Sequence, residues 1–172
     1  MERVLGAAAA VITWLGWLTI CPALGFPTLA TAAMINRAFF AKIPEAGHDP
    51  NFWVGWVILI AALIGAIVVF FILGRLRRVR AGIRTGAIYG VALWLLAGVV
   101  VMPLLGLTSQ VFFTAGALQP ADVMHPTVMM YSLGPLAPVA ALIAWVLFGA
   151  ILGATASPQH PRDIKPEGVP AR

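Results

Sequence analysis

The chain of 172 residues is 61% hydrophobic and only 10% charged, a composition that excludes a soluble globular protein and predicts a membrane protein. The net charge of +5 does not indicate a nucleic-acid partner, because the basic residues gather at the edges of long apolar runs. The single cysteine, Cys21, excludes an intramolecular disulfide and a C-x-x-C redox pair.

A helix needs about 20 apolar residues to cross the roughly 30 Å of hydrocarbon in a bilayer, and the sequence contains four such uncharged runs. We place their helices at 4–24, 52–74, 86–107 and 129–154. The expected fold is therefore an all-α transmembrane domain over residues 1–156 with four spanning helices. Residues 157–172 form a polar, proline-rich tail whose composition cannot bury a core.

The first run must be distinguished from a signal peptide, because Ala30-Thr31-Ala32 has the small residues of a cleavage site. The apolar core of a secretory signal is about 7–15 residues long, and this run is longer. We therefore expect the first span to be retained. Pro22 should end or kink its helix near the outer surface, and Pro103 should do the same in the third helix.

Arginines are concentrated between the second and third runs, at Arg75, Arg77, Arg78, Arg80 and Arg84. Positive residues accumulate in short cytoplasmic loops, so this loop is expected inside and, by alternation, both termini as well. The expected location is the bacterial cytoplasmic membrane. Specific binding of anionic lipid headgroups or of a partner is the alternative interpretation of the cluster.

The second half of the sequence repeats features of the first half. A shift of 80 residues aligns Trp14 with Trp94. Two motifs extend the match at slightly different shifts: Pro22-Ala23-Leu24-Gly25 with Pro103-Leu104-Leu105-Gly106, one inserted residue later, and Ala61-Ala62-Leu63-Ile64 with Ala140-Ala141-Leu142-Ile143 at a shift of 79. We therefore predict two repeated helical hairpins, repeat A over 4–74 and repeat B over 86–154. Repeated two-helix units keep one orientation, so a pseudo-two-fold axis along the membrane normal would relate them.

Small residues predict where the helices approach one another. Gly86-x-x-x-Gly90 opens the third run and Gly149-x-x-x-Gly153 closes the fourth. Because such spacing lets two helix backbones pack closely, we expect the third and fourth helices to meet at their cytoplasmic ends. A seam between two copies of the chain is the alternative.

One group of side chains has the chemistry of a metal site. Met124, His125 and Met129 follow closely in sequence, and His48 occupies a similar place in the first half. Thioether and imidazole ligands together favour soft metals such as Cu(I). Methionine is also an ordinary packing residue, so we predict no resident cofactor, and copper binding is the alternative.

The segments Gly90-Val91-Ala92-Leu93-Trp94 and Met102-Pro103-Leu104-Leu105-Gly106, with the small residues that end the fourth run, carry a resemblance. Over residues 86–154 the chain resembles a group of uncharacterised small four-helix bacterial membrane proteins. The resemblance implies a fold and no activity.

The four runs contain no charged residue that would serve a pump, a voltage sensor or an ion-coupled transporter. Catalytic fingerprints such as G-x-S-x-G and H-E-x-x-H are also absent from the sequence, so we do not expect an enzyme. The leading hypothesis is a non-catalytic accessory or scaffold subunit of a larger bacterial membrane complex, of respiratory or photosynthetic type, with lipids and other membrane subunits as partners. The alternatives are a small transporter or channel for an uncharged or lipidic solute, and a copper-handling membrane protein.

Overall fold

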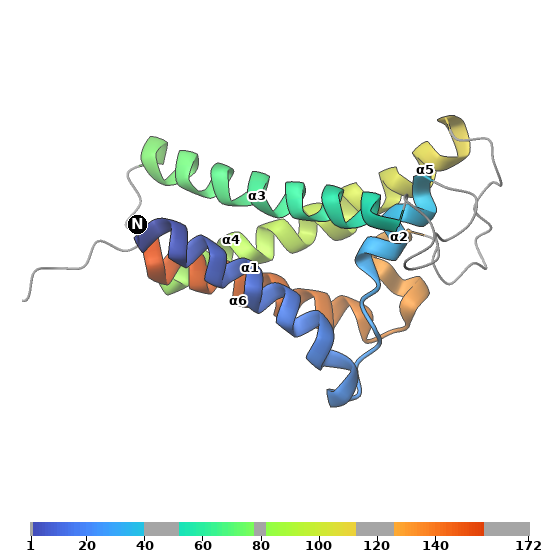
Figure 1. Ribbon diagram of the computed structural model, residues 1–172, viewed down its shortest axis with the longest axis horizontal. Coiled ribbons are helices and arrows are strands. Elements are labelled where there is room, and N and C mark those ends of the chain that lie inside the picture. The colour runs from blue at the N-terminus through green and yellow to red at the C-terminus, as the bar shows by residue number, and fades with distance from the viewer. Residues whose placement is uncertain (1, 40–51, 78–81, 113–125, 157–172) are drawn as a thin grey trace, which may run out of the picture.

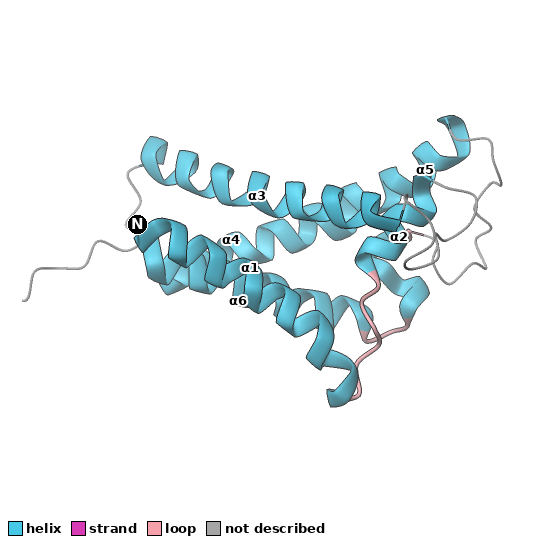
Figure 2. Cartoon of the chain, in the orientation of Figure 1, coloured by secondary structure: helices cyan, strands magenta, loops and turns pink. Residues whose placement is uncertain are grey.

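The computed structural model describes residues 2–39, 52–77, 82–112 and 126–156, and over these residues the chain is helical with short connections (Figures 1 and 2). The elements are α1 (Glu2–Ile20), η1 (Cys21–Leu24), α2 (Thr31–Phe39), α3 (Phe52–Arg77), α4 (Ile83–Leu95), η2 (Leu96–Val101), α5 (Met102–Phe112), η3 (Val128–Leu133) and α6 (Ala137–Ala156).

Four of these helical stretches are long and apolar enough to cross a membrane. They cover Val4–Leu24, Trp53–Gly74, Ile83–Leu107 and Ala137–Ala156. The prediction of an all-helical chain with four apolar spans is therefore confirmed, and the structure indicates a multi-pass membrane protein. The tail at 157–172 lies outside the described residues.

The start of the fourth helix was predicted wrongly, because α6 begins at Ala137 and not at residue 129. Residues 128–133 instead form a short 3₁₀ segment in which Met129 and Met130 adopt left-handed backbone angles, with φ of 55° and 60°. Gly134 follows with a φ of 125°. Pro138 lies in the first turn of α6, where a missing N–H costs no helical hydrogen bond. It therefore removes no hydrogen bond from the helix interior.

The two repeated prolines have different outcomes. At Pro22 the first helix tightens into η1, and this helical segment ends at Gly25. The φ of 84° at Gly25 lets its N–H donate to the carbonyl of Pro22 at 3.1 Å. Before Pro103 the helix widens into the π-type turns of η2, and the N–H of Met102 reaches the carbonyl of Ala97. The wider turn accommodates the proline, so α4, η2 and α5 form one continuous helix.

The helices pack unequally. α4 and α6 approach each other most closely, α1 packs on α6, and α2 packs on the start of α3. By contrast α3 has α2 as its closest backbone neighbour and runs apart from α1 and α6 (Figure 1). The backbone contacts therefore do not pair the helices of the two predicted repeats alike, and the duplication stays a prediction.

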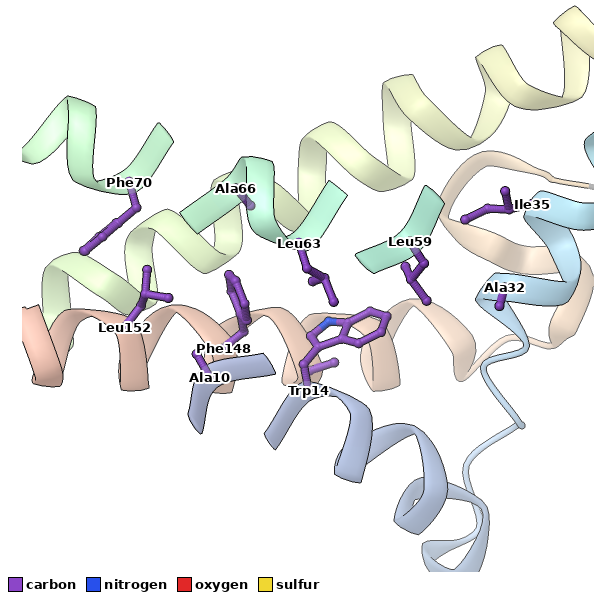
Figure 3. Close-up of a cluster of buried hydrophobic side chains, with 11 residues drawn as sticks. Ala10, Trp14, Ala32, Ile35, Leu59, Leu63, Ala66, Phe70, Phe148 and Leu152 are labelled. Atoms are coloured by element: carbon purple, nitrogen blue, oxygen red, sulfur yellow. The ribbon is translucent and has the colours of Figure 1, made fainter. Parts of the chain in front are cut away.

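Large side chains fill the space between α3 and the other helices. Leu59, Leu63 and Phe70 of α3 meet Trp14 of α1 and Phe148 of α6 in the main hydrophobic core (Figure 3). A second core lies near α2, η3 and the start of α6, and contains Cys21, Leu29, Met34, Met102, Met130, Ala137, Ala140 and Ala141.

Candidate functional site

The closest helix contact is a glycine seam between α4 and α6, made of Gly86, Gly90, Gly149 and Gly153. A Cβ added to Gly86 would collide with the carbonyl oxygen of Gly149 and lie 2.9 Å from the Cα of Gly153. A Cβ on Gly149 would collide with the carbonyl oxygen of Gly86 and lie 2.8 Å from the amide nitrogen of Gly90. Backbone thus lies directly against backbone, and only glycine fits.

Of the other glycines in α1 and α3, some contact a neighbouring helix and others have empty space beside them. A Cβ on Gly6 of α1 would collide with the side chain of Thr155 in α6. Gly65 and Gly74 of α3, and Gly16 of α1, have no atom within 4 Å of such a Cβ. The Gly6 contact therefore joins α1 to α6.

Two tryptophans hold the start of α6 in place. The indole N–H of Trp17 in α1 donates to the carbonyl of Ala140 at 2.9 Å. The indole N–H of Trp94 in α4 donates to the carbonyl of Pro138 at 3.0 Å. Since both carbonyls lie near the N-terminus of α6, the two bonds fix that end between α1 and α4.

Trp14, the residue that aligns with Trp94 in the predicted repeat, has no such bond. Its side chain is only 3% exposed, and its indole N–H has no hydrogen-bond partner. The ring packs against Trp145 with centroids 5.6 Å apart. Among the described residues, this indole nitrogen is the one buried side-chain polar atom left without a partner.

Two polar contacts that the sequence analysis missed attach α3 to its neighbours. Asn36 of α2 is 3% exposed, and its Oδ1 accepts a hydrogen bond from the N–H of Gly55 at 2.5 Å. Tyr89 of α4 donates its hydroxyl to the carbonyl of Ala66 at 2.6 Å. The sequence signal for the first contact is Asn36 itself, a lone asparagine in an apolar segment. One turn earlier in α2, the carbonyl of Ala32 leaves no room for a Cβ on Gly55.

The predicted metal ligands are only partly described. Met129 lies in η3, where its Sδ would stand 2.5 Å from a Cβ on Gly98 of η2, so its side chain fills a packing gap against the wide turn. His48, Met124 and His125 lie outside the described residues. No group of three or more His, Cys, Asp or Glu in the described part of the chain has the arrangement of a metal site.

The described arginines of the cluster lie at the end of the bundle where α3 ends and α4 begins. Arg75 and Arg77 belong to the last turn of α3 and Arg84 to the first turn of α4, while Arg78 and Arg80 lie outside the described residues. Arg84 is exposed. The N-terminus and the end of α6 lie at the same end of the bundle (Figure 1).

No family model, curated protein or solved structure matches the chain. The site must therefore be judged by its own geometry. In the described residues that geometry consists of a glycine seam, apolar helix faces, and one buried indole N–H without an acceptor.

Proposed function

We propose that the protein is a non-catalytic accessory or scaffold subunit of a larger bacterial membrane complex, with both termini and the arginine cluster in the cytoplasm. The observation that supports this most is the absence of charge at membrane depth. Within the four described spans Arg84 is the one charged residue, and it lies in the first turn of α4. Ion-coupled transport, proton transfer and voltage sensing all need charged groups deeper in the membrane.

The outer face of α3 supports the presence of a partner. Only 17% of this span is buried within the chain, and Ala61 and Gly65 both lie on its exposed face. Transmembrane helices associate through close packing at small residues, because lipid tails remove the hydrophobic driving force. Ala61-x-x-x-Gly65 is a pair of that kind, and no atom of the described residues lies within 4 Å of a Cβ added to Gly65.

Purification of the tagged protein from its native membrane in a mild detergent tests the proposal. We expect a stoichiometric membrane-protein companion, and we expect Gly65→Leu to lose it while keeping the helical content and thermal stability of the wild type. Gly16→Leu is the matched control, since Gly16 is also open but lies on α1. A lone monomer, or a companion retained equally by both variants, would contradict the proposal.

A small transporter or channel for an uncharged or lipidic solute is the rival function, and the buried polar residues argue against its form with a polar solute. Among the described residues these are Thr31 and Asn36, and both belong to α2 rather than to a spanning helix. We therefore expect urea and glycerol to leave proteoliposomes no faster than protein-free liposomes. A saturable, protein-dependent efflux would favour the transporter.

A further inference from the structure

We infer that the core between α1, α3 and α6 binds a small apolar molecule that carries a carbonyl oxygen, and that the indole N–H of Trp14 donates to this oxygen. The inference does not depend on the accessory role. It begins from a contrast among three indoles. Trp17 and Trp94 are partly buried and donate to backbone carbonyls of α6, whereas the more deeply buried Trp14 has no acceptor.

An unsatisfied buried donor is rare in folded proteins and calls for a partner. Water is poorly suited to this role, because a buried water usually makes about two to four hydrogen bonds. The cluster around Trp14 has eleven buried residues, and Trp14 has the only polar side-chain atom among them. A carbonyl oxygen needs only one donor, so a largely apolar molecule that carries a carbonyl group matches these surroundings better.

The indole nitrogen of Trp14 faces the hydrophobic core. Figure 3 shows the ring of Trp14 between α1 and α3, with its nitrogen on the side facing Phe148 and Leu63. α3 has its closest backbone contact with α2 rather than with α1, and side chains fill the intervening space. A molecule entering from the bilayer therefore has to displace side chains, and no tight backbone seam closes the path.

Depth in the membrane decides between two sources of a carbonyl group. Trp14 lies ten residues after Val4, the start of the first span, which corresponds to about 15 Å along a helix. That distance is half of the roughly 30 Å of hydrocarbon. The ester carbonyls of membrane lipids lie at the bilayer surface, so the expected ligand is a free compound that dissolves in the bilayer interior, such as a long-chain quinone.

The test uses the full chain in phospholipid nanodiscs with ¹⁵N-labelled indoles, which are assigned from single Trp→Phe variants. Titration with decylubiquinone should shift the indole proton of Trp14 downfield and saturate, while those of Trp17 and Trp94 stay in place. Decylbenzene has the same chain without a carbonyl, and it should cause no downfield shift. Both titrations are recorded on the wild-type protein, and the Trp14 signal can also be assigned by elimination from the variants of the other five tryptophans.

The variants add a measurement of decylubiquinone affinity. In Trp14→Phe the affinity is read from the indole signal of the neighbouring Trp145, and in the Trp145→Phe control it is read from the indole signal of Trp14. Trp14→Phe should weaken decylubiquinone binding about tenfold, the usual effect of one hydrogen bond. Trp145→Phe should change the affinity less than twofold. The inference is overturned if the Trp14 signal does not shift with decylubiquinone, or shifts equally with decylbenzene. It is also overturned if the Trp14 indole N–H is already hydrogen-bonded in nanodiscs without quinone, or if Trp14→Phe binds decylubiquinone as tightly as the wild type.

Discussion

Replacing Gly149 with alanine isolates the contribution of the glycine seam. The new Cβ would collide with the carbonyl oxygen of Gly86 and lie 2.8 Å from the amide nitrogen of Gly90. Backbone atoms cannot rotate away as a side chain can, so α4 and α6 must separate. Overpacking of this kind costs about 1–3 kcal/mol. Because the collisions are with backbone atoms, we place the cost of this substitution near the upper end of that range. The better helix propensity of alanine offsets about 0.5–1 kcal/mol of this cost.

The expected net loss for Gly149→Ala is about 2 kcal/mol, or roughly a 30-fold change in the unfolding equilibrium. Gly65→Ala is the matched control, because no atom lies within 4 Å of its new Cβ and only the gain in helix propensity applies. Both variants can be measured by reversible unfolding in mixed micelles of mild detergent and SDS, followed by circular dichroism. If Gly149→Ala were as stable as Gly65→Ala, the close packing of α4 on α6 would be refuted.

Two further contacts give expected outcomes in the same unfolding assay. Tyr89→Phe removes the hydroxyl that donates to the Ala66 carbonyl and should destabilise the protein by about 1 kcal/mol; a loss below about 0.3 kcal/mol would mean that this bond does not hold α3 against α4. Asn36→Leu leaves the N–H of Gly55 without its acceptor and should cost about 1–3 kcal/mol. Unchanged stability of Asn36→Leu would show that α2 does not depend on this bond. Thr19→Val, which removes an exposed hydroxyl bonded only within its own helix, is the control and should change the stability less than either variant.

Composition was sufficient to predict the helical class and the four spans, because a bilayer demands about 20 apolar residues for each crossing. The Gly86, Gly90, Gly149 and Gly153 positions could also be selected from spacing alone, and the structure brings them together. The start of α6 was placed eight residues too early. The left-handed turn at Met129 and Met130 has no glycine to signal it, but Gly134 and Pro135, directly upstream of α6, are residues that commonly mark a turn.

Side-chain contacts between segments distant in the sequence could not be predicted from sequence patterns. Similar motifs at Pro22 and Pro103 gave a helix end in one case and a continuous helix in the other, where the turns before the proline widen into η2. The missing partner of Trp14 was also invisible, since the aligned Trp94 does find an acceptor. Such differences depend on which carbonyl lies within reach, and only the packed helices determine that.

The accessory role is tested most directly by cross-linking in living cells from the outer face of α3. A photoreactive benzophenone amino acid at Ala61, which is exposed in this chain, should form a single discrete adduct with another membrane protein, and Gly65→Leu should abolish it. Adducts with lipid alone, or with a second copy of this chain, would contradict the account.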